Sequence, residues 1–310
     1  GRGNGLAHGA LAVAAAAGVA WAGWSSYDTY FMRQPRDAEV IHAYNAREAQ
    51  TARWVAADEG ALRYYSIYPA HPTVRLLAPN HPEHRMFYPL ESLPARGLVD
   101  RDVRYVMEPD FCPPADWFTA WYPDATVTWH DDLSGTPMLF TVDVPAEQVN
   151  EAQGARLDLY AGGTPLRSER ADTLWASGDE LLAAGATRAA WSGQLFVPQT
   201  GTYGFHLRAG GLATFILDDK PLALSDAGEV EEARVLAKGW HAVRLEAELA
   251  GGDVGVEWTR PDGVRERIPR EALNVRPAPT EGLYGLYYPN AEWVGAPAFG
   301  AVDRQIDFRW

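Results

Sequence analysis

Cysteine is almost absent from this chain. The one cysteine, Cys112, excludes an intrachain disulfide, and its Phe-Cys-Pro-Pro surroundings contain no obvious general base, so we interpret it as a structural thiol. Asn-x-Ser/Thr glycosylation acceptors, Gly-x-Ser-x-Gly elbows, His-Glu-x-x-His zinc motifs and phosphate-binding loops are also missing. The sequence therefore contains no recognisable catalytic constellation, and whether the parent protein is an enzyme stays open.

Positive charge is scarce as well. The 27 Lys and Arg residues face 41 Asp and Glu residues, which gives a formal net charge of -14 at pH 7. Binding to phosphate backbones needs clustered Lys and Arg, so this balance argues against nucleic acid as a partner and disfavours anionic membrane surfaces. A hydrophobic content of 47% and a length of 310 residues predict a folded chain with room for more than one domain.

Long apolar runs are rare, and the exception is residues 6–24, where His8 is the only ionisable side chain. Nineteen helical residues span about 28 Å, close to the hydrocarbon thickness of a bilayer. Trp21 and Trp24 lie at the end of the run, where interfacial aromatic residues belong, and Arg2 precedes it. Three interpretations stay open: a transmembrane helix, a signal peptide cleaved near Ala20-Trp21-Ala22, and a buried core helix.

Residues 26–148 alternate helical and strand patterns. Asp37 is placed to cap a helix that runs to about residue 58. We expect strands at 63–67 and 103–108, a short helix at 113–122, and a terminal hairpin formed by 126–130 and 138–144. This order predicts a small α/β layer domain with an antiparallel edge.

Several motifs in this part resemble a membrane enzyme family. The apolar segment leads into Tyr27-Asp28-x-Tyr30-Phe31, and His71-Pro72-Thr73-Val74-Arg75, Tyr122-Pro123-x-Ala125 and Gly135-x-Pro137 follow. Over residues 6–148 the chain resembles the soluble C-terminal region of protein-mannosyltransferase-like membrane glycosyltransferases. In that family the catalytic acidic residues lie in the membrane portion, so the resemblance assigns no catalytic residue to this sequence.

From residue 155 onward the pattern becomes that of short antiparallel strands. At 241–249, apolar Val243, Leu245 and Ala247 alternate with Arg244 and Glu246, which is typical of a half-buried strand. Strands of this kind at turn-bounded intervals predict an antiparallel β-sandwich. The whole chain is thus expected to be an α+β multidomain protein, with an N-terminal apolar helix, a small α/β layer domain and an antiparallel β-sandwich.

The order of landmarks in the sandwich resembles one family. Trp191-Ser192-Gly193, Gly201-Thr202-Tyr203-Gly204-Phe205, Lys238-Gly239-Trp240-His241 and Pro261-Asp262-Gly263 follow one another as in the protective-antigen β-sandwich domain, the PA-fourteen domain. The resemblance covers about 154–275 and implies a module that is frequently a carbohydrate-binding attachment. A glycan or polysaccharide, or a partner protein, is the binding partner that follows from it.

A second, truncated copy of the same domain is expected at 282–310. Gly282-Leu283-Tyr284-Gly285 resembles the opening of the domain, and the chain stops where the next strand would begin. Because the chain also begins with Gly1, we expect a fragment or a processed chain. An orphan opening strand leaves backbone groups unpaired, so residues 278–310 are expected to pack poorly unless a partner completes them.

The candidate carbohydrate-binding residues are Asp218, Asp219, Trp240 and His241. Some sugar-binding members of the family hold Ca²⁺ with adjacent aspartates that precede a strand, whereas Asp218-Asp219 follows one, where the family usually has Asp-Gly. We therefore interpret Asp218 as a turn residue and Asp219 as a replacement for glycine, and expect no metal or cofactor, with Ca²⁺ as the alternative. Trp240, like Trp191 and Trp258, also fits a core landmark of the sandwich.

These patterns predict four segments: an apolar helix at 1–25, an α/β domain at 26–148, the sandwich at 149–277 and the incomplete second opening at 278–310. The favoured function is a non-catalytic extracytoplasmic portion of a membrane glycosyltransferase, attached to the membrane through its N-terminal helix. A stand-alone surface adhesion module and a structural spacer without a small ligand are the alternatives.

Overall fold

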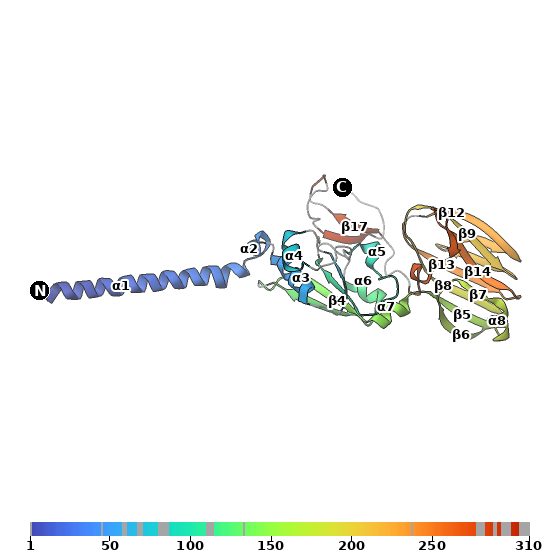
Figure 1. Cartoon of the computed structure of the whole chain (residues 1–310), viewed down its shortest axis with the longest axis horizontal. Helices are drawn as coiled ribbons and strands as arrows, with labels where there is room; N and C mark the ends of the chain where they lie inside the picture. The colour runs from blue at the N-terminus through green and yellow to red at the C-terminus, as the bar shows by residue number, and fades with distance from the viewer. Residues whose placement is uncertain are drawn as a thin grey trace.

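A computed structural model of the chain describes residues 2–44, 46–57, 61–66, 71–79, 87–109, 115–132, 134–236, 238–276, 283–287, 290–292 and 299–303. Figure 1 shows a long helix at one end, an α/β part in the middle and a pair of β-sheets at the other end. The predicted fold class, α+β multidomain with an apolar helix, an α/β layer and an antiparallel sandwich, is confirmed. The exact domain boundaries drawn from the sequence stay predictions.

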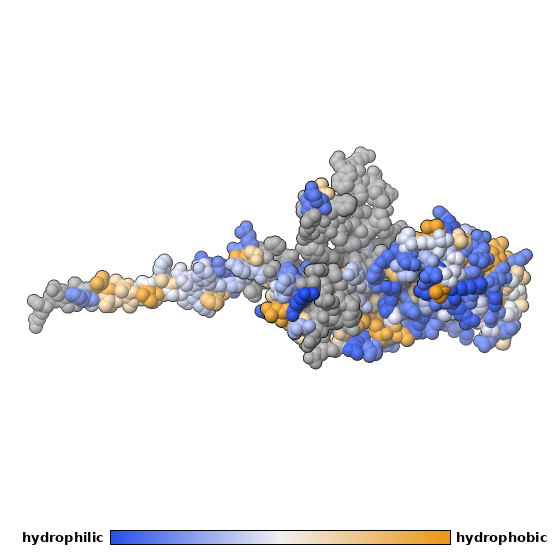
Figure 2. Space-filling view, turned by 45° about the horizontal axis from the view of Figure 1, so that its top comes forward, coloured by the Kyte–Doolittle hydropathy of each residue, from blue (hydrophilic) through white to orange (hydrophobic). Residues whose placement is uncertain are grey.

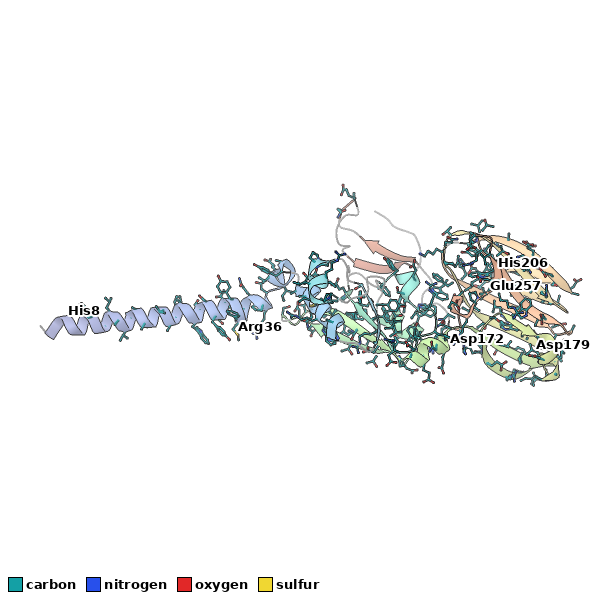
Figure 3. The ribbon with its side chains drawn as sticks, in the orientation of Figure 1. His8, Arg36, Asp172, Asp179, His206 and Glu257 are labelled. Atoms are coloured by element: carbon teal, nitrogen blue, oxygen red, sulfur yellow. The ribbon has the colours of Figure 1, made fainter. Side chains whose placement is uncertain are left out.

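Helix α1 (Arg2–Tyr27) continues without a loop into η1 (Asp28–Arg33) and η2 (Gln34–Arg36). The stretch His8–Arg36, whose ends are labelled in Figure 3, is long and apolar enough to cross a membrane by length and composition. None of the apolar residues that make this stretch long enough to cross a membrane is buried inside the protein. Figure 2 shows apolar residues spaced along the projecting helix. This exposure disfavours the buried-helix interpretation and leaves the membrane anchor and the signal peptide.

The middle part is built on a four-stranded sheet with the order β1-β2-β4-β3. Strand β1 (Leu62–Tyr65) runs parallel to β2 (Val103–Met107), whereas β4 (Pro137–Val144) pairs antiparallel with β2 and with β3 (Thr126–Asp131). The predicted strands and the antiparallel edge are confirmed, with small shifts at the strand ends. The helices of this part are α2 (Ala38–Ala43), α3 (Ala46–Ala57), α4 (Pro72–Leu77), α5 (Pro89–Ser92), α6 (Ala115–Trp121) and α7 (Ala146–Ala152).

The predicted helix cap is present, but the helix is shorter than expected. The carboxylate of Asp37 accepts hydrogen bonds from the backbone N–H groups of Glu39 and Val40, as an N-cap residue does. The single helix expected to run to about residue 58 is instead divided into α2 and α3. In the sequence, Asn45 stands between the two helices. Asparagine is unfavourable in the interior of a helix because its side chain competes for backbone hydrogen bonds.

Strand β2 is buried on both faces, and apart from the half-buried Arg104 its residues are apolar or aromatic. Tyr105 packs with Phe87, Phe118 and Phe140 in one cluster, while Val106 belongs to a second cluster on the other face. Ring contacts such as Tyr105–Phe118, with centroids 5.0 Å apart, join the sheet to helix α6.

Two antiparallel sheets form the C-terminal sandwich. One has the order β11-β10-β13-β8-β5-β6, with β16 added beside β8, and the other has the order β12-β9-β14-β15, with β7 added beside β14. Strand β13 contains the alternating stretch recognised in the sequence, and its apolar residues Val243, Leu245 and Ala247 are buried as predicted. The elements are β5 (Ala155–Ala161), β6 (Thr164–Ala171), β7 (Trp175–Ser177), α8 (Gly178–Ala183), β8 (Arg188–Val197), β9 (Gly201–Ala209), β10 (Ala213–Leu217), β11 (Lys220–Ser225), β12 (Gly228–Leu236), β13 (Gly239–Glu248), β14 (Asp253–Thr259), β15 (Arg265–Arg267), η5 (Arg270–Ala272) and β16 (Leu273–Asn274).

Aromatic side chains fill the space between the sheets. Trp191 and Trp258 are buried there together with Tyr203, Phe205 and Phe215, so their predicted core role is confirmed. Phe205 and Phe215 meet across the sandwich with ring centroids 5.3 Å apart. This interior is packed with large side chains, so ligands must be bound at the surface or the edges of the sheets.

The C-terminal tail is described only in part. Strands β17 (Leu283–Tyr287) and β18 (Phe299–Asp303) form an antiparallel pair. The opening strand therefore has a partner within the chain. Most of the predicted second copy, like Cys112, lies outside the described residues.

Candidate functional site

The predicted Asp218-Asp219 turn is a tight hairpin connection. These two residues join β10 to β11, whose last and first residues, Leu217 and Lys220, are paired. Both aspartates have positive φ angles, 50° at Asp218 and 61° at Asp219. A two-residue hairpin loop with two positive φ angles normally carries glycine at its second position. Asp218 is thus a turn residue, and Asp219 stands at the position where glycine is usual; its origin as a replacement for glycine stays an interpretation.

The Asp218 carboxylate is held against the neighbouring strand β13. One oxygen, Oδ2, lies 2.8 Å from Nδ1 of His241, and Oδ1 accepts a hydrogen bond from the backbone N–H of Ala242 at 3.1 Å. The backbone N–H of Asp218 in turn donates to the carbonyl of Ala242 at 2.9 Å. Two of the predicted site residues, Asp218 and His241, are thus brought into direct contact although they lie far apart in the sequence.

This turn forms part of a cleft at the edge of the sandwich. Strands β11 and β12 are the edge strands of the two sheets, and the cleft, with a volume of about 220 Å³, lies by the first residue of β11 and the last residues of β12. Apart from the turn, its lining combines charged and apolar residues. Its lining residues are Leu217, Asp218, Lys220, Arg234, Val235, Leu236 and His241.

The second aspartate of the turn faces a different cleft. Asp219 lines a hollow of about 460 Å³ together with the polar side chains of Ser192, Gln194 and Arg244. These residues come from β8 and β13 of the seven-stranded sheet. The turn therefore contributes one carboxylate to each of two surface clefts.

Trp240 occupies a different environment from the other three predicted residues. Its ring contacts Trp121 of helix α6 and Phe196 of β8, with centroid distances of 5.5 Å and 5.1 Å. The Arg96 guanidinium lies over Phe196 at 3.8 Å, and Lys238 forms an ion pair with Glu91 of the α/β part. Trp240 therefore packs between the sandwich and the α/β part and does not lie in the sandwich core. Its predicted role in sugar binding stays a prediction.

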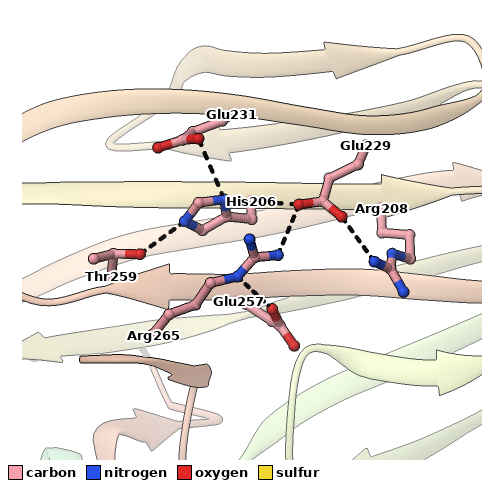
Figure 4. A network of polar contacts seen from close by, with 7 residues as sticks. All are labelled: His206, Arg208, Glu229, Glu231, Glu257, Thr259 and Arg265. Atoms are coloured by element: carbon pink, nitrogen blue, oxygen red, sulfur yellow. Dashed lines mark hydrogen bonds and ion pairs between the residues drawn. The ribbon is translucent and has the colours of Figure 1, made fainter. Parts of the chain in front are cut away.

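Sequence reasoning missed a charged network on the outer face of the five-stranded sheet (Figure 4). Glu229 of β12 accepts hydrogen bonds from Arg208 of β9 at 2.8 Å and from Arg265 of β15 at 2.7 Å. These bonds, from Arg208 first and then Arg265, lower the pKa of Glu229 to about 2. Arg265 also donates to Glu257 at 2.8 Å. The sequence did contain a signal for this network. Charged residues recur along β12 and β15, and residues two apart in a strand lie on the same face of the sheet.

His206 lies at the centre of this network and is almost completely buried. Its Nε2 contacts Oγ1 of Thr259 at 2.7 Å, and its Nδ1 lies 3.7 Å from Glu231 and 3.9 Å from Glu229. Glycosidase chemistry needs two carboxyl groups across a cleft, whereas Glu231 and Glu257 are part of the polar network on the sheet surface. The network cross-links four strands, β9, β12, β14 and β15, and does not present a free pair of carboxylates.

Within the described part of the chain, no group of three or more His, Cys, Asp and Glu side chains is placed to hold a metal ion. The peptide bond between Asp218 and Asp219 is trans. The carboxylate of Asp218 is already engaged by His241 and Ala242. Whether calcium binds at this turn stays a prediction.

Comparison with known proteins supports the identity of the sandwich. Residues 166–272 match the PA14 domain family, from β6 to the end of η5. This match covers about a third of the chain. No curated protein matches the sequence.

Several solved structures resemble the chain at low identity. An anti-sigma factor domain-containing protein from Clostridium clariflavum is 17% identical with a TM-score of 0.36, over 49% of this chain and 59% of that protein. The epithelial adhesin 9 A domain of Candida glabrata, in complex with Galb1-3GlcNAc, is 12% identical with a TM-score of 0.34, over 41% and 91%. A GH31 alpha-xylosidase from Xanthomonas citri is 18% identical with a TM-score of 0.31, over 48% and 17%. The chain spans about six tenths of the anti-sigma factor domain-containing proteins it resembles.

Proposed function

We propose that this chain is a non-catalytic, extracytoplasmic portion of a membrane glycosyltransferase, and that its PA14-type sandwich binds carbohydrate. The observation that carries the binding proposal is the fixed carboxylate of Asp218 at the mouth of a surface cleft, within the segment that matches the PA14 family. Saccharide recognition requires polar groups that are already held in place, because ordering them on binding would reduce affinity. Asp218 and His241 meet this requirement.

Three further observations support the remaining parts of the proposal. The helix over His8–Arg36 can cross a membrane by length and composition, which suits an anchored protein whose later residues are extracytoplasmic. The α/β part has strands and an antiparallel edge where the sequence predicted them, in the region that resembles the tail of a mannosyltransferase-like enzyme. The pairing of β17 with β18 repeats the antiparallel pairing of β5 with β6 at the start of the sandwich, which supports a second truncated copy.

Glycan-array binding of the full chain, reconstituted in lipid nanodiscs, tests the binding proposal. We expect one or more glycans to bind, and expect Asp218→Ala and His241→Ala to reduce this binding at least tenfold. Asp100→Ala is the matched control, because it removes an exposed carboxylate of the α/β part, paired with Arg101, that is remote from the clefts. Absence of binding to every glycan, with and without Ca²⁺, would favour the structural-spacer alternative.

The membrane glycosyltransferase proposal has its own test in the parent gene. Several predicted membrane helices upstream, with an acidic pair in the first extracytoplasmic loop, would support it. A signal peptide that starts at a methionine shortly before Gly1 would contradict it and favour a stand-alone surface adhesion module.

A further inference from the structure

The cleft beside the Asp218-Asp219 turn contains two cationic side chains without partners. Lys220 at the start of β11 and Arg234 of β12 line the cleft, and neither forms a hydrogen bond or ion pair with another described residue. Several other arginines on the surface of the sandwich are ion-paired, as Arg188 is with Glu246 and Arg208 with Glu229. Two unpaired cations in one cleft are unusual in a chain with a net charge of -14.

The one carboxylate in the cleft does not neutralise these cations by contact. Both oxygens of Asp218 are used, one by the His241 ring and one by the backbone N–H of Ala242. The side chains of Lys220 and Arg234 are exposed to solvent and so are accessible to a ligand. The cleft therefore offers unused donors and an excess of positive charge to an incoming ligand.

The volume of the cleft and its apolar lining further restrict which ligands can bind there. A volume of about 220 Å³ is smaller than the roughly 300–1,000 Å³ of sites that enclose drug-sized molecules, so one sugar residue and not an extended chain fits. The exposed side chain of Val235 provides apolar surface for the C–H groups of a pyranose ring. A guanidinium binds a carboxylate through two parallel hydrogen bonds, which an uncharged hydroxyl cannot reproduce.

We propose that this cleft selects an acidic saccharide, with the carboxylate of a uronic acid residue bound by Lys220 and Arg234. The inference rests on the proposed carbohydrate-binding function and specifies its ligand class. Asp218 and His241 position the rim of the cleft, and the two cations supply the selectivity for charge.

The test uses the full chain in nanodiscs and a panel of glucuronate-, galacturonate- and mannuronate-containing oligosaccharides, each paired with its carboxyl-reduced counterpart. We expect at least one acidic oligosaccharide to bind ten or more times tighter than its reduced counterpart. This preference should weaken as the salt concentration rises from 50 to 300 mM, because the contacts are charge-assisted and exposed.

Single substitutions assign the preference to the cleft. Lys220→Gln and Arg234→Gln should each weaken binding of the acidic oligosaccharide about five- to tenfold and leave that of the reduced counterpart unchanged. Arg167→Gln removes the same charge from β6, outside the cleft, and should change neither. Circular dichroism of each variant verifies the fold.

The outcomes separate the two proposals. Equal binding of every acidic and reduced pair, or binding of neutral glycans only, would overturn the acidic-ligand inference while the carbohydrate-binding function stands. Equally tight binding of poly-aspartate would overturn it as well, because the cleft would then recognise charge and not a saccharide. Absence of any saccharide binding would overturn both.

Discussion

Glu229→Gln is the substitution for which the structure gives the clearest expected magnitude. It removes the charge that accepts hydrogen bonds from Arg208 and Arg265, and it loosens the links between β12, β9 and β15. A pKa of about 2 in place of 4.5 would correspond to about 3 kcal/mol of folding free energy without solvent screening. Because the Glu229 side chain is 34% exposed, we expect about 1 kcal/mol.

The pH dependence of this contribution has a defined sign. The folded-state pKa of Glu229 is lowered, so the stabilisation is fully present above about pH 4.5 and is lost as the pH falls towards 2. Native-state amide exchange of β9 and β12 in the full chain measures it locally. We expect protection to fall about fivefold in the variant at pH 7, since 1.4 kcal/mol corresponds to a factor of ten.

A matched control distinguishes this network from ordinary surface ion pairs. Glu169→Gln removes one exposed contact to Arg167 at 3.2 Å and should change protection less than twofold. Equal protection of wild type and Glu229→Gln at pH 7, or an equal loss at pH 7 and near pH 2, would refute the argument that the two arginines stabilise the carboxylate form.

Three further substitutions test other parts of the account. Asp219→Gly should raise the midpoint of thermal unfolding, with a gain of about 0.5–1 kcal/mol, because glycine adopts a φ of 61° without strain, whereas Asp219→Ala should give no gain. Gly210→Ala should lower that midpoint strongly, because its Cβ would lie 2.1 Å from the carbonyl oxygen of Gly251. Trp240→Ala should destabilise by about 3 kcal/mol, and amide exchange in α6 should rise with that in β13, since its ring packs against Trp121.

The periodic features of the fold could be predicted from the sequence. Alternation along β13 defines which side chains are buried, and the spacing of Asp218-Asp219 after β10 defines a two-residue turn. Contacts between residues distant in sequence could not be predicted. The hydrogen bond from His241 to Asp218 depends on the register between β10 and β13, which alternation alone does not define.

Trp240 illustrates why the candidate site was only partly predictable. Its position in the family pattern predicts an aromatic residue at the start of β13 that either packs in the sandwich core or binds sugar. Period-two alternation shows which face of a strand the side chain occupies, but not what covers that face. Here helix α6 of the preceding part covers it through Trp121, so the residue packs at an interface.

The most direct test of the central claim is amide exchange of the full chain in the presence of a glycan found to bind it. If carbohydrate is bound at the turn, protection should increase at residues 217–221 and 240–243, which line or flank the smaller cleft. Protection confined to β9 and β14 on the other sheet, or no protection at saturating glycan, would contradict the account.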